Sequence, residues 1–203
     1  MERKTQKGYL LLADISGYTS FVARTEIEHA EKAISILLEA VIEKLANLFT
    51  IAKLEGDAVF AYLPEDQLAS CNTLFDLIDN TYSTFRDSAY ALQNRATCPC
   101  KACQAILSLD IKFLVHHGEY ILQHVAGIRD LLGSDVTLIH RLAKNSVSES
   151  MGWHGYILLT DQSLECMQAS KKPFIVQSET YEHLGDVQTY IMDLHSRYDE
   201  MKK

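Results

Sequence analysis

Apolar and polar positions follow two different periods along the chain, and together they predict a protein of mixed strands and helices. An apolar run over residues 8–14 ends at Asp14 and predicts a strand. From Thr25 to Phe49 apolar residues recur at helical spacing, which predicts an amphipathic helix. Residues 50–55 and 57–63 predict two short strands joined near Gly56, as in a hairpin.

The rest of the chain continues this alternation of strands and helices. In chain order, the remaining predictions are a helix over 64–95, a loop over 96–106, paired strands over 109–115 and 120–125, a short helix over 134–146, a strand over 155–160, a helix capped by Asp161, and strands over 174–176 and 187–192. This order matches a ferredoxin-like α+β fold, in which an antiparallel sheet carries its helices on one face.

Composition narrows the functional classes. With 203 residues, 47% hydrophobic and 23% charged, the chain is long enough for one folded domain. A net charge of −8 argues against nucleic acid or an anionic membrane as partner, although a nucleotide held through metal ions stays compatible. The start of the chain is polar and no run approaches membrane-spanning length, so we expect a cytoplasmic protein with no membrane contact.

Two aspartates stand at positions suited to metal chemistry. Asp14 closes the first predicted strand, and Asp57 follows Gly56 at the hairpin. Carboxylates at strand ends beside glycine are suitable ligands for a hard cation that bridges phosphates, and two of them suit a two-metal phosphoryl-transfer site. The simpler reading is that each aspartate only terminates its strand.

Three cysteines form a second candidate site in the predicted loop. Cys98, Cys100 and Cys103 are spaced Cys-x-Cys-x-x-Cys, which indicates zinc or another soft metal, or a redox device. Structural zinc usually has four ligands, and the spacing leaves the fourth open. The candidates for it are His116, His117, His124 and Cys71. The alternative is a group of thiols that bind nothing.

Five short motifs in a fixed order carry a family resemblance. They are Asp14-Ile-Ser-Gly-Tyr-Thr19, Lys53-Leu-Glu-Gly-Asp57, His116-His-Gly118, the set Gly133, Val136, Arg141 and Leu142, and Gly185-Asp186 with Tyr190. In this order they resemble the class III adenylyl and guanylyl cyclase catalytic domain. The resemblance implies the ferredoxin-like cyclase fold, with one domain over 1–203, a core over about 8–192, and loop 96–106 as an insertion. The cysteine loop resembles that of a bacterial branch of cyclase-like proteins.

The resemblance also implies an activity, the conversion of ATP to 3′,5′-cyclic AMP and pyrophosphate. Asp14 and Asp57 would hold two Mg²⁺ or Mn²⁺ ions. The backbone of the following loop would cradle phosphates through its N–H groups. This loop comprises Ile15, Ser16, Gly17, Tyr18 and Thr19.

Further roles follow from the same resemblance. Lys53 and Asp130 would recognise adenine, because Lys can donate a hydrogen bond to a ring nitrogen and Asp can accept one from the exocyclic amine. Arg141 would stabilise charge on the α-phosphate, and Thr137 stands where the family has Asn. The implied assembly is a homodimer whose sites form between two chains, with Asp14 and Asp57 of one chain opposite Arg141 of the other.

Two departures from the family pattern leave rival functions open. The side chain of Thr137 is too short to reach as far as the amide of Asn. Segment Glu182-His-Leu184 stands where many members have a phosphate-binding lysine, and Lys171 or Lys172 would have to bind the phosphate instead. One alternative is therefore a catalytically degenerate module that binds a nucleotide or a partner protein. A weaker one is another two-metal nucleotidyl reaction on a related sheet.

Overall fold

An inner strand of the sheet is built by the apolar run at the start of the chain. The structure is a computed structural model and describes residues 4–202. Strand β1 (Gln6–Ser16) is buried without a break from Gly8 to Ala13, because sheet neighbours and helices enclose it on all sides. The other strands are β2 (Thr50–Glu55), β3 (Ala58–Pro64), β4 (Asp110–Val125), β5 (Ile128–Leu132), β6 (Tyr156–Thr160), β7 (Ile175–Tyr181) and β8 (Gly185–Asp193).

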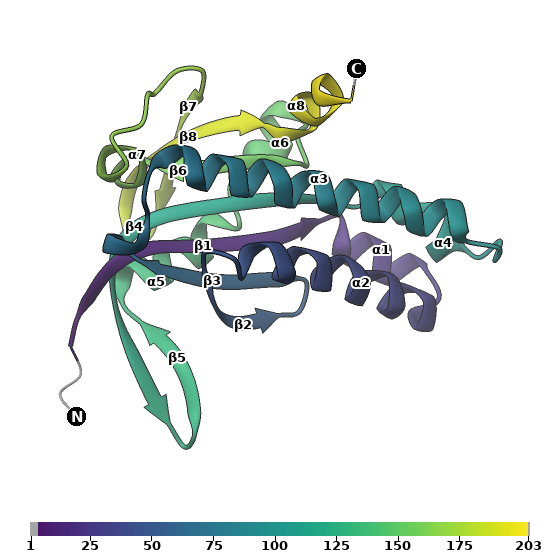
Figure 1. Cartoon of the computed structure of the whole chain (residues 1–203), viewed down its shortest axis with the longest axis horizontal. Helices are drawn as coiled ribbons and strands as arrows, with labels where there is room; N and C mark the ends of the chain where they lie inside the picture. The colour runs from purple at the N-terminus through teal and green to yellow at the C-terminus, as the bar shows by residue number, and fades with distance from the viewer. Residues whose placement is uncertain (1–3, 203) are drawn as a thin grey trace.

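The described strands form one sheet in the order β2-β3-β1-β4-β6-β8-β7, with β5 paired to the outer part of β4. Every pairing is antiparallel except that of β4 with β6. The helices are α1 (Tyr18–Arg24), α2 (Ile27–Leu45), α3 (Cys71–Arg95), α4 (Lys101–Ala105), α5 (Ser134–Leu142), α6 (Val147–Met151), α7 (Asp161–Cys166) and α8 (Leu194–Met201), with 3-10 turns at Glu65–Gln67 and Ile106–Ser108. The predicted α+β class is thereby confirmed (Figure 1).

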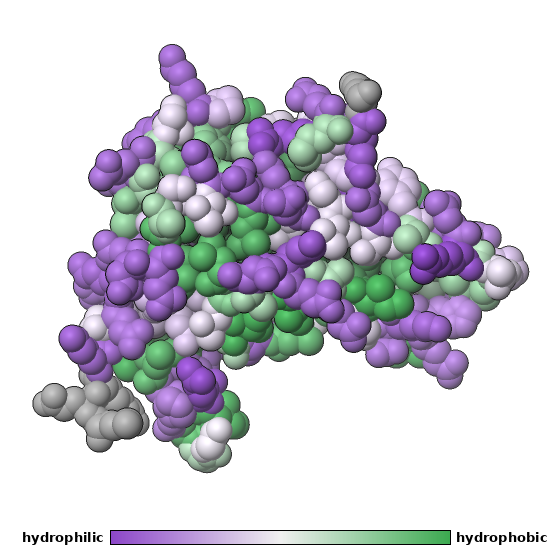
Figure 2. All heavy atoms as spheres, viewed as in Figure 1, coloured by the Kyte–Doolittle hydropathy of each residue, from purple (hydrophilic) through white to green (hydrophobic). Residues whose placement is uncertain are grey.

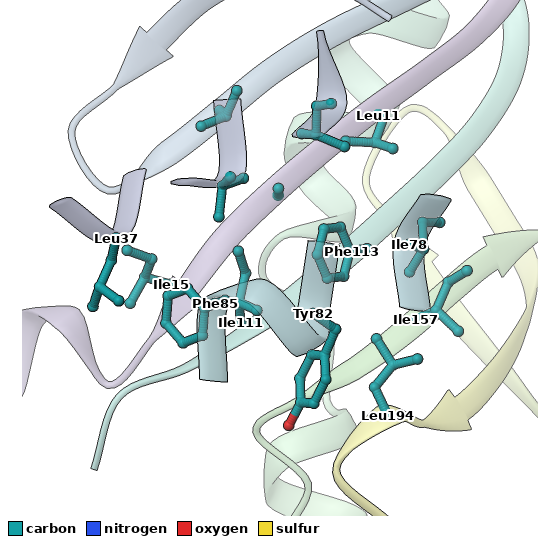
Figure 3. Packing of buried hydrophobic residues seen from close by; sticks show 14 of the residues in the cluster. Leu11, Ile15, Leu37, Ile78, Tyr82, Phe85, Ile111, Phe113, Ile157 and Leu194 are labelled. Carbon is teal, nitrogen blue, oxygen red and sulfur yellow. The ribbon is translucent and has the colours of Figure 1, made fainter. Parts of the chain in front are cut away.

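Helices cover both faces of the sheet, so the expectation of helices on one face is wrong. Helices α2 and α3 pack on one face over Leu11, Ile111 and Phe113 (Figure 3). Helix α5 packs on the other face, where Ile139 and Leu142 meet Leu10. The reason is that β1 and β3 are apolar on both faces, and each face needs its own cover. None of the helices within residues 4–202 is long and apolar enough to cross a bilayer.

Strand β4 corrects a second prediction, that residues 120–125 pair with 109–115. They are one continuous strand of 16 residues, which pairs with β1 as far as Tyr120. Glu119 continues the alternation of faces and does not mark a turn. The turn comes at Ala126 and Gly127, whose φ angles of 51° and 84° are those of a two-residue hairpin turn, and β5 is the true partner.

Some helices depart from the sequence prediction at their boundaries. Helix α3 begins at Cys71, because the Ser70 hydroxyl caps it by accepting from the Thr73 N–H, and Pro64 ends β3 instead. Helices α1, α4, α6 and α8 were not predicted, and they are short; α4 lies within segment 96–106, which was predicted to be a loop. Their apolar residues are too few to produce a helical period, and tertiary packing decides their conformation.

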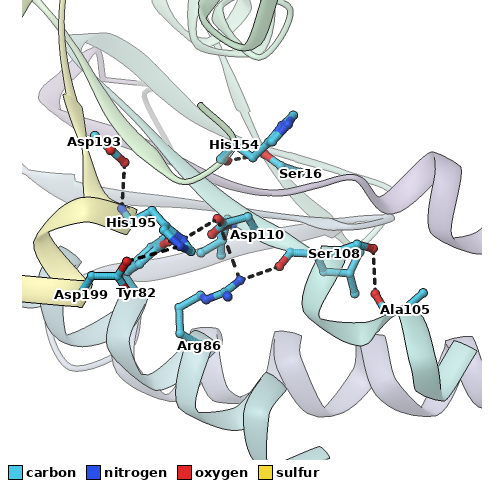
Figure 4. Close-up of polar contacts among 12 residues, drawn as sticks. Ser16, Tyr82, Arg86, Ala105, Ser108, Asp110, His154, Asp193, His195 and Asp199 are labelled. Carbon is cyan, nitrogen blue, oxygen red and sulfur yellow. Dashed lines mark hydrogen bonds and ion pairs between the residues drawn. The ribbon is translucent and has the colours of Figure 1, made fainter. Parts of the chain in front are cut away.

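A buried ionic network fixes the joint between α3, α8 and the start of β4 (Figure 4). Arg86 is 4% exposed; it donates to the Leu109 carbonyl at 2.9 Å, and its guanidinium lies 4.0 Å from Asp110 Oδ2. His195 Nδ1 lies 3.3 Å from the same carboxylate oxygen. Asp110 is paired in register with Ser16, and Ser16 Oγ donates to the His154 carbonyl at 2.6 Å. The network therefore anchors the end of β1.

Replacing Arg86 with Met should destabilise the fold by about 3 kcal/mol, because Asp110 would keep a buried charge without its guanidinium. Denaturant unfolding followed by circular dichroism measures this. Arg95→Ala, at the exposed end of the same helix, should change stability by less than about 0.5 kcal/mol. The double variant Arg86→Met/Asp110→Asn should recover part of the loss. Equal stability of Arg86→Met and wild type would contradict the role given to the network.

Candidate functional site

Asp14 and Asp57 meet at one end of the central strands. Asp14 lies near the end of β1 and is in register with Ala58 of β3, the residue that follows Asp57. Asp57 itself occupies the β2–β3 turn, which Gly56 closes with a φ of +67°. The Ile15 N–H donates to the Asp57 carbonyl at 3.3 Å, and the Asp14 carboxyl lies near enough to Asp57 for its charge to raise the pKa of Asp57. The structure thus brings together two residues that are 43 positions apart in the sequence.

The electrostatics of this pair favour a bound cation. Burial, followed by the charge of Asp14, raises the pKa of Asp57 to about 6. Lys112 is the cation next to the pair: its Nζ lies 3.2 Å from Asp14 Oδ2 and donates to the Ala143 carbonyl at 2.9 Å. One ammonium does not neutralise two ionised carboxylates. Close carboxylate oxygens with unbalanced negative charge fit a hard divalent ion such as Mg²⁺ or Mn²⁺.

The loop after Asp14 turns directly into helix α1. Gly17 has a φ of +87° and stands at the N-cap of α1, a conformation that an L side chain rarely adopts. A Cβ at this position would also lie 3.2 Å from the Ser108 carbonyl. Segment 15–19 is therefore a tight strand-to-helix turn beside the two aspartates. The Ser16 hydroxyl is already engaged by His154 and the Ile15 N–H by Asp57, so the Tyr18 and Thr19 hydroxyls and the rest of the loop backbone are what remain for a ligand.

Lys53 and Asp130 form a second cluster at the outer strands. Lys53 Nζ lies 3.2 Å from Asp130 Oδ1 and 2.7 Å from Glu55 Oε1. Desolvation opposes the charge on Lys53, but hydrogen bonds to Glu55 and Asp130 raise its pKa overall. Desolvation likewise acts against Asp130, whose pKa is lowered by the Leu131 N–H and by Lys53. The two residues predicted to read a base are therefore in contact within one chain.

Sequence reasoning missed Glu55 and His140 in this cluster. Glu55 lies two positions after Lys53 on the same strand, so period-two alternation puts both on one face. His140 Nδ1 lies 3.2 Å from Glu55 Oε2, and its ring packs on Phe60 with centroids 4.8 Å apart. Burial lowers the pKa of His140. Lys112 was missed too, although its alternating strand could have placed it opposite Asp14.

Helix α5 presents Thr137 and Arg141 on one exposed face, one turn apart. Thr137 Oγ1 donates to the Gly133 carbonyl at 3.3 Å, so part of its hydrogen-bonding capacity is used within the helix. The Arg141 side chain makes no ion pair or hydrogen bond to any residue between 4 and 202. It is therefore free to meet an anion from outside this chain.

The His116-His-Gly118 motif positions this helix. His116 is 2% exposed; its Nδ1 lies 2.9 Å from Thr160 Oγ1, and its Nε2 lies 3.3 Å from Asp135 Oδ1 in poor alignment for a hydrogen bond. The other Asp135 oxygen accepts from the Glu119 N–H at 2.6 Å. A Cβ on Gly118 would lie 2.4 Å from the Asp135 carboxyl, so only glycine leaves room for it. The motif lies within a continuous strand and ties β4 to the first turn of α5.

Two groups predicted from the sequence lie away from these clusters. Lys171 binds Asp161 at 2.6 Å, and Asp161 follows β6 at the end opposite to the one near Asp14. Cys98, Cys100 and Cys103 gather beyond the end of α3, beside α1 and the start of α2 (Figure 1). The three cysteines do come together, at a site of their own.

Comparison with known sequences identifies a family. A protein-family model described as "Protein of unknown function (DUF2652)" matches residues 34–151, more than half of the chain. An uncharacterized protein of Mycobacterium tuberculosis, Rv2561/Rv2562, is 32% identical over 159 residues, which cover 78% of this chain and 72% of that protein.

Comparison with solved structures identifies the fold. The guanylyl cyclase Cya2 aligns with a TM-score of 0.73 at 14% identity, covering 94% of this chain and 93% of that one. The adenylyl cyclase CyaB from P. aeruginosa aligns with a TM-score of 0.64 at 16% identity, covering 95% and 97%. A bacterial light-regulated adenylyl cyclase aligns with a TM-score of 0.69 at 15% identity; this chain covers 51% of it and so spans about half its length.

These likenesses agree with the five motifs and with the order of strands and helices. At such low identities they establish the fold, which is that of the class III nucleotide cyclase catalytic domain. The match to the family model and the mycobacterial relative establish membership at the level of sequence. The chain belongs to the family described as "Protein of unknown function (DUF2652)", and it has the nucleotide cyclase fold.

Proposed function

We propose that the protein is a class III adenylyl-cyclase-like enzyme that converts ATP to 3′,5′-cyclic AMP and pyrophosphate. The observation that carries the proposal is the grouping of the predicted residues into two clusters on a cyclase fold. Asp14 lies in register with Ala58, the residue after Asp57, and Lys53 contacts Asp130 at 3.2 Å. Both clusters join residues that separate sequence motifs had singled out, and this supports the proposal.

Each cluster has a role in the proposed reaction. Asp14 and Asp57 would hold divalent ions, which when bound activate the ribose hydroxyl and neutralise the triphosphate. The backbone of segment 15–19 would bind phosphate oxygens. Lys53 and Asp130 would recognise the adenine edge, by donating and accepting respectively. Arg141 would meet charge that develops on the α-phosphate.

A homodimer is part of the proposal, because Arg141 is exposed and without a partner among the described residues. The β4–β5 hairpin projects from the body and bears exposed apolar side chains at Val125, Ile128 and Leu132 (Figures 1 and 2). Exposed apolar groups on a projecting arm favour association with another chain. In a twofold dimer, each chain would give its aspartates to one site and its Arg141 to the other.

A catalytically degenerate nucleotide-binding module is the second candidate, and specific observations favour it. Thr137 stands in place of an Asn amide, and its hydroxyl donates to the Gly133 carbonyl. Lys112 already pairs with Asp14. The first feature weakens stabilisation of the transition state, and the second competes with a metal ion for Asp14. They leave the contact between Lys53 and Asp130 in place, so nucleotide affinity would persist without turnover.

Product analysis separates the two candidates. With Mg²⁺ or Mn²⁺ and ATP, the purified protein should release cyclic AMP, and Asp57→Asn should lower the rate at least about 100-fold because one metal carboxylate is lost. GTP in a parallel reaction tests base choice. Asp76→Asn, an exposed change on α3, is the matched control and should leave the rate unchanged. Bound ATP with no cyclic product would overturn the enzyme proposal in favour of the binding module.

Mixing two inactive variants tests the shared site. Asp57→Asn and Arg141→Ala chains, unfolded and refolded together in equal amounts, should regain about a quarter of wild-type activity. The reason is that half of the dimers are mixed, and each mixed dimer has one intact site. Either variant refolded alone should stay inactive. The absence of recovery, with dimers present by light scattering, would count against a site built from two chains.

Stability provides a test that does not depend on turnover. Since folding raises the pKa of Asp57 to about 6, its ionised form opposes folding at pH 7. Asp57→Asn should therefore stabilise the protein at pH 7 by about 1 kcal/mol, after allowance for solvent screening. The advantage should shrink as pH falls from 7 towards 4, because wild-type Asp57 then becomes neutral. Urea titrations at both pH values measure it; a less stable variant at pH 7 would refute this electrostatic account.

A further inference from the structure

The cysteine loop meets a histidine from a distant helix. Cys98, Cys100 and Cys103 gather around His29, which lies in the first turn of α2. His29 Nδ1 lies 3.1 Å from Cys100 Sγ and 3.8 Å from Cys103 Sγ. The four potential ligand atoms all lie within 4.8 Å of one another. They form a closed set of three sulfurs and one nitrogen, drawn from two segments about 70 residues apart.

We propose that this cluster is a structural zinc site with His29 as its fourth ligand. Zinc bonds of 2.3 Å to sulfur and about 2.0 Å to nitrogen in a tetrahedron separate neighbouring ligand atoms by about 3.6–3.8 Å. The distance from His29 Nδ1 to Cys103 Sγ, 3.8 Å, lies at the upper end of that spacing, and the distance to Cys100 Sγ, 3.1 Å, lies below it. Small side-chain rotations would therefore suffice to place one ion among the four atoms.

The local backbone supports a preformed half-site. Cys100 and Cys103 have the Cys-x-x-Cys spacing of zinc sites, and Cys100 is the N-cap of α4. The Cys103 N–H donates to Cys100 Sγ at 3.4 Å, so the loop already supplies a hydrogen bond to this sulfur. Such a bond holds a ligand in place before the metal arrives.

The surrounding charges also suit a metal with three thiolates. A Zn²⁺ ion with three thiolates and a neutral imidazole carries a net charge of −1. Lys32 and Arg95 line the cavity that His29 and Cys98 border. These cations offset the negative charge of the loaded site, and they repel a free divalent ion only weakly because they are solvated.

The other candidates for the fourth ligand lie elsewhere. Cys71 begins α3, about 36 Å along the helix from Arg95. His116 is buried against Thr160 and Asp135, and His117 lies 3.4 Å from Glu65 Oε2. His124 is on the projecting β4–β5 hairpin. His29 precedes the cysteines by some 70 positions, so no local spacing pointed to it.

The zinc site would join the cysteine loop to the first turn of α2, next to the connection between α1 and α2. Glu26, the N-cap of α2, accepts from the Ala102 N–H at 3.2 Å, within the cysteine loop. Metal at His29 would add a second and stronger tie between the same two segments. The expected consequence is zinc-dependent stability of loop 96–106 and of the first turn of α2. This inference does not depend on the proposed cyclase activity.

Metal titration of the reduced full-length protein tests the site. One Zn²⁺ per chain should remain bound after gel filtration. Co²⁺ should give the thiolate charge-transfer and tetrahedral visible bands of a sulfur-rich site. His29→Ala should weaken zinc binding on the order of 100-fold, and Cys100→Ser by at least as much. Cys71→Ser and His124→Ala, which change a cysteine and a histidine outside the cluster, should bind as wild type does.

Two further measurements guard against misfolded variants. His29→Cys retains a ligand at this position and should restore tight binding with a four-sulfur cobalt spectrum. Hydrogen exchange of the wild type should slow in residues 96–106 and 27–30 when Zn²⁺ is added. Failure of the reduced protein to retain zinc, or undiminished binding by a folded His29→Ala, would overturn the proposal.

Discussion

The pairing of β1 with β4 is the constraint on which the rest of the structure depends. Eleven residues of each strand are in register, from Gln6 opposite Tyr120 to Ser16 opposite Asp110. This register sets Lys112 beside Asp14 and puts Asp110 where Arg86 and His195 can reach it. A slip of one residue would turn every one of these side chains to the other face of the sheet. The chemistry at Asp14 is thus fixed by strands whose buried apolar residues allow one alignment.

Much of the fold could be predicted from the sequence because its strands and long helices have strong periods. The strand at residues 8–14, the hairpin at 50–63 and the long helices lie where their apolar patterns indicated. The errors fell where local pattern and tertiary context differ. Residues 116–119, which include two histidines and Gly118, interrupt the apolar run and resemble a turn, yet pairing with β1 carries the strand through them. The placement of helices on both faces of the sheet depends on tertiary packing, which cannot be read from the sequence of any single segment.

The candidate site divides in the same way. Residues that belong to short ordered motifs, such as Asp14, Asp57 and Lys53, could be singled out from the sequence, although their chemical roles stay predictions. Glu55, His140 and His29 could not be assigned, because each acquires its neighbours only through folding. Lys112 is intermediate, since its partner follows once the register of two strands is known. Spacing in the sequence identifies local ligand sets, whereas sets that cross between elements require the structure.

The unbroken length of β4 has a mechanical consequence. One strand of 16 residues carries Asp110 in the buried network, Lys112 beside the aspartates, His116 under α5, and the arm of the projecting hairpin. No loop separates these residues within β4, so no flexible segment of this strand would absorb a displacement of the hairpin. A second chain that bound the hairpin and tilted it would displace β4, and with it both Lys112 beside Asp14 and helix α5, which bears Arg141. Binding of another chain to the hairpin would therefore be coupled to the geometry at the carboxylates through one segment of backbone.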